Sequence, residues 1–303
     1  MGIVKCVFVG NREVNIEYNE KVFTEDFYYT NHLDRDSMIS ITLPEGITEI
    51  GEKSLSGVWT SLLLREINLP SALVKINLGA FKNNNSLTEI KLPENLTYIA
   101  RDAFKSCKNL RSITIPKNIT EIYSNTFAKC DKLASVKFPE GLKKIGLCAF
   151  SLCPNLEYTL PESVEVVERG AFDRAKYLSN KIPPKLLVLE LHALGYIAIN
   201  DKTKTKAQVY IHENVKSIGE AFWRENKYAA DIIISEKFKG KISVRLFYPR
   251  SDENNFYLLK NDELIPLIIP KNSYQDIYKS MRSISISEIL KLMENQETSV
   301  IEQ

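Results

Sequence analysis

The chain has 303 residues, and its 40 lysine and arginine side chains against 38 aspartate and glutamate side chains give a formal net charge of +2. A balance this close to zero excludes the strong positive field of a typical nucleic-acid-binding domain, so nucleic acid is not an expected partner. The longest apolar runs are also far shorter than the roughly 18 to 20 residues that cross a bilayer, so we expect no membrane insertion.

Residues 1–40 lie before the regular part of the sequence and are predicted to form an N-terminal β cap. Two strand-like runs, 3–9 and 12–18, are joined by Gly10 and Asn11, which supply the positive φ angles of a tight hairpin. A repeat array needs such an atypical unit to cover its first core layer. No apolar core followed by a small-residue cleavage site is visible here, which favours a cytoplasmic protein if the chain is complete.

Residues 41–248 are predicted to form a repeat solenoid, with clear repeats over 41–178 and degenerate repeats over 179–248. Three columns recur every 23 residues: Pro93, Pro116 and Pro139; Phe104, Phe127 and Phe150; and Cys107, Cys130 and Cys153. A fixed period of roughly 20 to 30 residues is the signature of stacked coils that share one core. We expect about nine coils, rich in β-structure and with short helical turns.

One repeat unit shows how each coil is built. Ile90 and Leu92 alternate around Lys91, which is the period of a strand with one buried face. Pro93 ends that strand because it has no amide hydrogen to donate. A second short strand is expected at Ile99, and residues 100–107 then turn the chain back. The phenylalanine of each unit, in positions such as 104, is predicted to fill the centre of the core.

The cysteine column is interpreted as core packing. The five cysteines are an odd number with no C-x-x-C pair, and no histidine joins the column. Small, buried, apolar thiols explain such a position most simply. A zinc site or a redox role is the alternative.

Residues 249–303 are predicted to form a C-terminal capping region of short strands and one helix near 285–296. Ser285 or Ser287 is the expected N-cap. Four apolar residues at helical spacing are predicted to cover the far end of the core: Ile286, Ile289, Leu290 and Met293.

No catalytic motif is present in the sequence. There are three histidines, and the patterns H-E-x-x-H, G-x-S-x-G and G-x-G-x-x-G are absent. His192 and His212 occupy turn positions and are interpreted as structural. The glutamates that follow the prolines offer too few oxygen ligands for calcium, so they are interpreted as solvated turn residues. We therefore predict a protein that is not an enzyme and has no catalytic, cofactor-binding or metal-binding residues.

Outward-facing residues next to each proline are predicted to lie side by side on neighbouring strands and to form a protein-binding face. The candidate residues are Arg65, Glu66, Asn68, Thr88, Glu89, Lys91, Arg111, Ser112, Thr114, Ser135, Lys137, Glu157 and Thr159. Charges and hydroxyls are mixed here without the aromatic series that stacks on nucleic-acid bases. A rigid, curved row of this kind suits recognition of another protein.

The repeat closely resembles the BspA-like branch of leucine-rich repeat proteins, whose unit follows the scheme I/V-x-L-P-x-x-I/L-x-x-I-x-x-x-A-F-x-x-C-x-x-L. The resemblance implies a solenoid that binds proteins and, in several members, adhesion at the cell surface to host matrix proteins. Two alternatives stay open: a structural scaffold or spacer whose terminal regions make the contacts, and a glycan-binding surface, for which only Trp59 and Tyr177 lie near the face. We expect a monomer.

Overall fold

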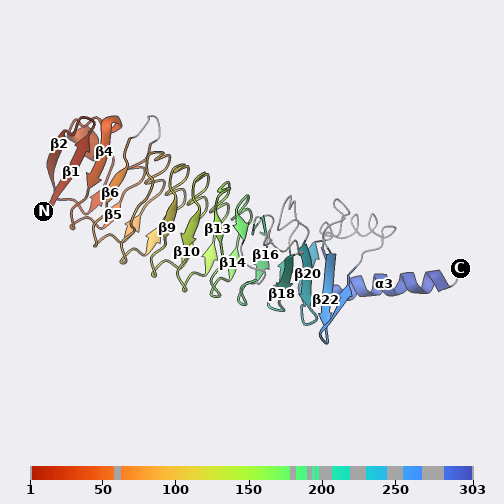
Figure 1. Cartoon of the computed structure of the whole chain (residues 1–303). Coiled ribbons are helices and arrows are strands. Elements are labelled where there is room, and N and C mark those ends of the chain that lie inside the picture. The colour runs from red at the N-terminus through yellow and green to blue at the C-terminus, as the bar shows by residue number, and fades with distance from the viewer. Residues whose placement is uncertain are drawn as a thin grey trace.

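The computed structural model describes residues 2–57, 63–177, 182–189, 193–194, 196–197, 207–218, 230–243, 255–267 and 283–301. The described chain is an elongated β-solenoid of about eight turns with few helices (Figure 1), which confirms the predicted architecture and comes close to the predicted nine coils. The predictions for Trp59, His192 and the side chain of Tyr177 fall outside the described residues. Within the described part, no helix is both long enough and apolar enough to cross a membrane.

The N-terminal cap is a hairpin joined to the first coil. Strands β1 (Gly2–Phe8) and β2 (Glu13–Tyr18) pair antiparallel, and Gly10 and Asn11 in the turn have φ angles of 80° and 60°, as predicted. Strand β4 (Met38–Thr42) pairs antiparallel with β1 and parallel with β6 (Glu66–Asn68). The cap and the first coils therefore share one sheet, in the order β2-β1-β4-β6. Helix α1 (Asp26–Thr30) and a short 3-10 turn (Arg35–Ser37) complete the cap.

Each coil contributes one strand to each of two sides of the solenoid. On the first side, the sheet β2-β1-β4-β6 is followed by a parallel sheet of β9 (Ser112–Thr114), β11 (Ser135–Lys137), β13 (Glu157–Tyr158), β15 (Lys176–Tyr177) and β17 (Tyr196–Ile197). We call the solvent-facing surface of this first side, together with residues 88–91 between its two sheets, the strand face.

The second side carries a shorter strand from each coil, also in two sheets. The first sheet consists of β3 (Val22–Phe23), β5 (Glu49–Ile50), β7 (Lys75–Ile76) and β8 (Tyr98–Ile99). The second consists of β10 (Glu121–Ile122), β12 (Lys144–Ile145), β14 (Val166–Val167), β16 (Val188–Leu189), β19 (Ser217–Ile218), β21 (Lys241–Ser243) and β24 (Ser283–Ile284). The predicted second strand at Ile99 is therefore confirmed.

Both sides are interrupted at the same coil. Residues 89–91 form no strand between β6 and β9, and β8 does not pair with β10. The turns, in contrast, remain joined there: Phe104 N donates to Thr126 O at 2.8 Å, and Ser106 N donates to Ala128 O at 2.8 Å. Within the described residues, this coil is thus held to its neighbour mainly along the turns.

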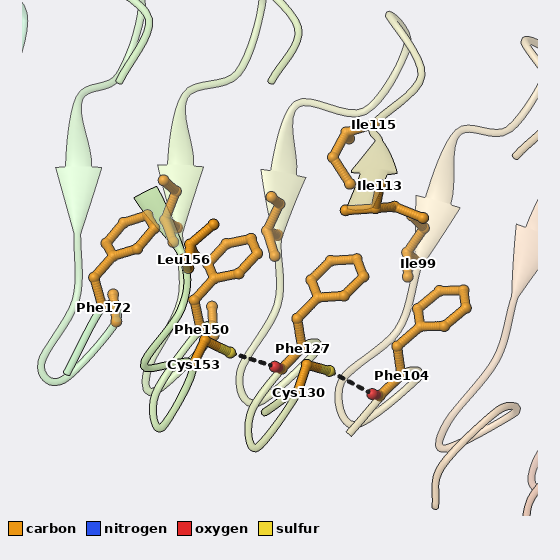
Figure 2. Packing of buried hydrophobic residues seen from close by; sticks show 14 of the residues in the cluster. Ile99, Phe104, Ile113, Ile115, Phe127, Cys130, Phe150, Cys153, Leu156 and Phe172 are labelled. Carbon is orange, nitrogen blue, oxygen red and sulfur yellow. Dashed lines mark hydrogen bonds between the residues drawn. The ribbon is translucent and has the colours of Figure 1, made fainter. Parts of the chain in front are cut away.

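The phenylalanine column runs through the centre of the solenoid (Figure 2), as predicted. Phe81, Phe104, Phe127, Phe150 and Phe172 are fully buried, and successive ring centroids lie 4.9, 5.3, 5.2 and 5.1 Å apart with interplanar angles between 4° and 8°. Leu55 before Phe81 and Leu194 after Phe172 occupy equivalent positions in their coils and are also fully buried. Each such side chain contributes roughly 1.5 to 3 kcal/mol through burial, which a single coil could not provide alone.

The cysteine column is buried beside the phenylalanines, which confirms its interpretation as core. Cys107, Cys130 and Cys153 are all fully buried. Each thiol also donates to the phenylalanine carbonyl of the preceding coil. Cys107 donates to Phe81 at 3.1 Å. Figure 2 shows the other two bonds, from Cys130 to Phe104 at 3.3 Å and from Cys153 to Phe127 at 3.2 Å. The position therefore favours a small apolar side chain that also carries a weak donor.

Tight turns in each coil place residues in the left-handed region. One position holds Gly79, Asp102, Asn125, Cys148 and Gly170, and a second holds Asn83, Ser106, Lys129, Leu152 and Arg174, with φ angles between 53° and 72°. A side chain with a Cβ atom adopts this conformation at a cost of roughly 1 to 2 kcal/mol, which glycine avoids.

Replacing Lys129 by glycine is accordingly expected to stabilise the protein. Lys129 is exposed with φ of 61°, so little packing is lost and the strain of its Cβ atom is relieved. We expect a gain of about 0.5 to 1 kcal/mol, measured as a higher midpoint of urea unfolding. Lys129→Ala is the matched control, because it removes the same side chain and keeps the strain. Equal midpoints for the two variants would contradict the strain argument.

The C-terminal region closes the solenoid. A sheet in the order β18-β20-β22-β23 is formed by β18 (Ala207–Ile211), β20 (Ala230–Ser235), β22 (Asn255–Lys260) and β23 (Glu263–Pro266). Helix α3 (Ile286–Ile301) starts where predicted and extends past residue 296. Ser285 caps it, because Ser285 Oγ accepts from Glu288 N at 3.3 Å and Ser285 N donates to Glu288 Oε2 at 2.7 Å. Ile286 and Ile289 are buried against the core, as predicted.

Candidate protein-binding face

The predicted face residues all lie on the strand face or directly beside it, and every one of them is exposed. The parallel register aligns them in rows across the coils: Ser112 and Glu157 flank Ser135 in one row, and Thr114 neighbours Lys137 in the next. Alternate residues of the same strands, such as Ile113, point into the core. The strands thus present polar side chains on a frame that the buried columns hold in place.

The strand face also extends over the N-terminal cap, which sequence analysis did not predict. In the register of the first sheet, Lys5 pairs with Thr42 and Thr42 with Asn68, so one row continues from β1 through β4 to β6. Ile3 lies on β1 and is 57% exposed, which adds an apolar side chain to a polar surface. The alternation of Ile3 and Lys5 with buried residues in the sequence of β1 indicates that these two side chains are exposed. It does not indicate which strand β1 pairs with.

The face is interrupted where the sheets are interrupted. Thr88, Glu89 and Lys91 are exposed in the correct coil, yet residues 89–91 form no ladder with either neighbour. A single backbone hydrogen bond, from Arg111 N to Thr88 O at 3.0 Å, connects this part of the face to the next coil. The predicted row of side chains is therefore divided into two patches. One lies on the sheet that ends at β6, the other lies on the sheet that begins at β9, and residues 88–91 separate them.

Cations on the strand face are largely without acidic partners. Arg65, Lys91, Arg111 and Lys137 form no ion pair within the described part of the chain, whereas Lys176 pairs with Glu157 at 3.1 Å. Asn68 Nδ2 donates to Glu66 Oε1 at 3.1 Å, so this carboxylate already has a neighbour on the face. The unpaired guanidinium and ammonium groups keep their hydrogen-bonding capacity for a ligand.

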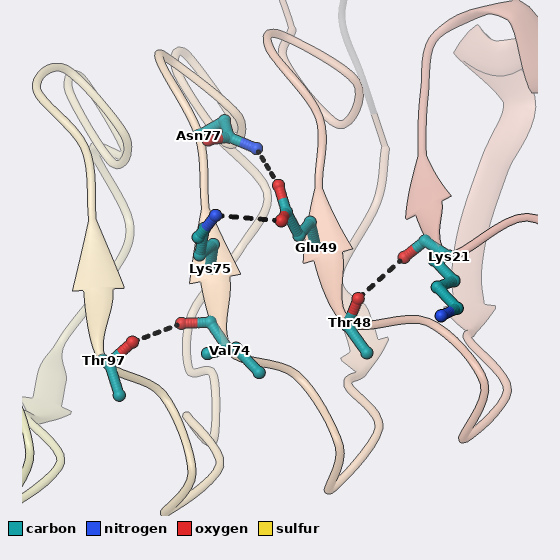
Figure 3. A network of polar contacts seen from close by, with 7 residues as sticks. All are labelled: Lys21, Thr48, Glu49, Val74, Lys75, Asn77 and Thr97. Atoms are coloured by element: carbon teal, nitrogen blue, oxygen red, sulfur yellow. Dashed lines mark hydrogen bonds and ion pairs between the residues drawn. The ribbon is translucent and has the colours of Figure 1, made fainter.

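The second side of the solenoid satisfies its own charges. Figure 3 shows Glu49 accepting from Lys75 Nζ at 3.1 Å and from Asn77 Nδ2 at 3.4 Å. The hydrogen bond from Lys75 holds the pKa of the Glu49 carboxyl below its ordinary value. Further along, Lys144 lies between Glu168 at 2.9 Å and Glu121 at 3.0 Å, and these contacts raise the pKa of its ammonium group. Carboxylates and lysines alternate there, so few charges are left for a partner.

The remaining candidate residues that the structure describes are His212 and the possible metal ligands. His212 is structural, as predicted: its Nε2 lies 2.7 Å from Pro183 O, and its Nδ1 accepts from Asn214 N at 3.2 Å. In the parts of the chain that the structure describes, no three histidine, cysteine, aspartate or glutamate side chains are grouped to hold a metal ion.

Comparison with known proteins agrees with the repeat architecture. The family model described as "BspA type Leucine rich repeat region (6 copies)" matches residues 57–179 and 157–266. Among curated proteins, none is similar enough in sequence to count as a match.

Several solved structures are similar to this chain. A leucine-rich repeat protein from Bacteroides ovatus has 22% identity and a TM-score of 0.64, and the match covers 89% of this chain and 64% of that one. The T. pallidum leucine-rich repeat protein has 26% identity and a TM-score of 0.41, covering 56% of this chain and 86% of that one. The pneumococcal vaccine antigen PcpA has 20% identity and a TM-score of 0.45, covering 82% and 67%.

The Bacteroides ovatus protein shares the fold, and this chain spans only 64% of its length. The family model extends over well over half of the present chain. The family-model match leads to the same conclusion as the structure, with its buried phenylalanine and cysteine columns and its paired strands. The chain belongs to the BspA-type leucine-rich repeat family.

Proposed function

We propose that this chain is a non-enzymatic module that binds another protein across its strand face. Membership of the leucine-rich repeat family indicates a protein-interaction or adhesion-type module. The observation that carries the more specific proposal is a contrast between the two sides. Lys75 and Lys144 in the second-side strands pair with carboxylates. The strand-face cations Arg65, Lys91, Arg111 and Lys137 pair with no described residue. Charged and polar groups placed in this way supply specificity and rapid association.

The frame supports this use of the strand face. Neighbouring strands are about 4.8 Å apart, so side chains from several coils meet the same partner. Within each of the two patches, the strand backbones are fixed by the ladder and by the buried columns, which lowers the entropy lost on binding. Protein partners of the adhesion type, including extracellular-matrix proteins, are the class that we propose.

The test is a charge-reversal variant of the face, with Arg65, Lys91 and Arg111 all changed to glutamate. We expect at least a tenfold loss of binding to the partner, measured by pull-down and by binding to an immobilised panel of extracellular-matrix proteins. The control changes Lys21, Lys143 and Lys216 to glutamate; these three exposed lysines all directly precede second-side strands, and the change in net charge is identical. Unchanged capture by the face variant would reject the proposal.

A scaffold whose terminal cap makes the contacts is the second candidate. It is favoured by exposed apolar side chains in the cap, where Tyr29 is 69% and Val9 is 57% exposed. For a scaffold, changing Val9 and Tyr29 to serine abolishes capture while the charge-reversal variant of the strand face retains it. The same pull-down therefore separates the two functions.

A further inference from the structure

We propose that the turns 78–88, 101–111 and 124–134 form a docking site for a short acidic segment of a partner protein. We call this surface the basic edge. Its cations are Lys82, Arg101, Lys105, Lys108, Arg111, Lys129 and Lys132. Only Arg111 also belongs to the strand face, so the basic edge is a second, adjoining surface. The proposal depends on the proposed function in one respect, namely that the partner is a protein.

Positive charge is concentrated on the basic edge, although the chain as a whole is nearly neutral. The three turns carry seven cations and two anions, Asp102 and Asp131, although the net charge of the whole chain is only +2. The equivalent turn of the next coil, residues 147–157, carries no cation and one anion, Glu157. The positive field is therefore local, and it ends abruptly after three coils.

Most of these cations lack a counter-charge. Lys105 pairs with Asp102 at 3.2 Å. The other six form no ion pair with any described residue, and all of them except Lys82 are exposed. Like charges in adjacent coils repel each other, and among the described residues the Lys105–Asp102 pair offsets only part of that repulsion. On the second side of the same coils, Lys75 has Glu49 across the ladder at 3.1 Å, so the basic edge shares its lack of partners with the strand face but not with the second side.

The turns hold these cations on a rigid frame. Asn83 N donates to Lys105 O at 2.8 Å, Lys132 N donates to Lys108 O at 3.0 Å, and Ala134 N donates to Arg111 O at 2.8 Å. The backbones of the three coils are thus locked together at the positions that carry the charges. A ligand meets a preformed array and does not have to order it.

The length of the basic edge suits a short peptide. Two steps of about 4.8 Å between coils, plus the reach of the side chains, give a span of about 20 Å, which about six extended residues cover at roughly 3.3 Å each. Arginine side chains such as Arg101 and Arg111 present forked donors that match carboxylates. Aspartate and glutamate within one short run therefore complement this surface.

Longer polyanions fit less well. No aromatic side chain is available on the basic edge for base stacking, which single-stranded nucleic acids use. The proline turns on the other edge of the strand face are mixed in charge, with Glu45, Glu94, Glu140 and Glu162 beside Lys117, so they offer no continuous cationic track for a polymer that continues around the solenoid. Both features favour a segment that stays within three coils.

The experiment measures binding of a fluorescein-labelled peptide of about eight residues, alternating aspartate and glutamate with serine, by fluorescence anisotropy in about 150 mM salt. We expect the variant with Arg101, Lys108 and Lys132 changed to glutamate to bind at least tenfold more weakly. The Lys21, Lys143 and Lys216 control, with the same change in net charge, should lose less than twofold. Higher salt should weaken binding to the unmodified protein.

Three results would overturn the inference: no peptide binding by the unmodified protein at low salt, an equal loss in both variants, or tighter binding of a sulfated hexasaccharide or an oligothymidylate than of the peptide. The last result would assign the basic edge to a polysaccharide or a nucleic acid. A further result would separate the two proposals. If the strand-face variant retains partner capture while the unmodified protein still binds the peptide, the proposed function fails and the acidic-segment site stands.

Discussion

Replacing Phe127 by alanine is expected to destabilise the protein by about 3 to 5 kcal/mol. Phe127 is fully buried, with its ring stacked 5.3 Å from Phe104 and 5.2 Å from Phe150. Truncation leaves a cavity between two coils whose spacing is fixed by backbone hydrogen bonds, so the neighbours cannot collapse into it. The measurement is the free energy of unfolding from urea titration, monitored by far-ultraviolet circular dichroism.

Phe127→Leu is the matched control for this change. Leucine already occupies the column at Leu55 and Leu194, so the coil geometry accepts it, and we expect less than half the loss. A loss below about 1 kcal/mol for Phe127→Ala would mean that the column does not hold the coils together.

Alkaline pH is expected to destabilise the folded chain through its buried thiols. Burial raises the pKa of Cys107 from the ordinary value of 9.0 to about 12, and burial does the same for Cys6. Because the folded state keeps these protons after the unfolded state has lost them, their stabilising contribution is complete below pH 9.0 and is lost as the pH rises towards about 12. One thiol accounts for a loss of about 2 kcal/mol by about pH 10.5.

The contribution of one thiol is isolated by comparing the pH dependence of two chains. Tyrosines and lysines also titrate in this range, but they do so equally in the unmodified protein and in Cys107→Ala. The variant should therefore lose about 2 kcal/mol less than the unmodified protein between about pH 8 and about pH 10.5. Parallel curves from urea titrations across this range would show that Cys107 ionises no later in the folded state than in the unfolded one.

The repeat fold could be predicted from the sequence because its main contacts join equivalent residues of adjacent units. Once Phe104 and Phe127 are recognised as the same position, their stacking follows from the period alone. The thiol-to-carbonyl hydrogen bonds could not be predicted in this way. A cysteine such as Cys130 suits a buried position whether or not its thiol donates a hydrogen bond, so the sequence does not distinguish the two cases. Left-handed turn residues were missed for a similar reason, since Lys129 and Leu152 carry no compositional signal for positive φ.

The candidate face was predictable in part. Exposure of Ser135 and Lys137 follows from alternation around partly buried Val136, and the structure places them in register with Ser112 and Thr114. Extension of the face over the cap depends on pairing of β1 with β4 across about thirty residues, which no local pattern encodes. The interruption at residues 89–91 was equally hidden, because Ile90 and Leu92 keep the strand alternation of the other coils.

That interruption has a mechanical consequence for recognition. A continuous ladder on both sides of a solenoid resists curvature, and at residues 88–99 both ladders stop while the line of turns between Phe104 and Thr126 persists. Changes in curvature should therefore concentrate at this coil, with the turns serving as the pivot. The N-terminal patch, with Arg65 and Asn68, can then tilt relative to the patch around Ser135 to follow a convex or a flat partner, without exposing the stacked rings.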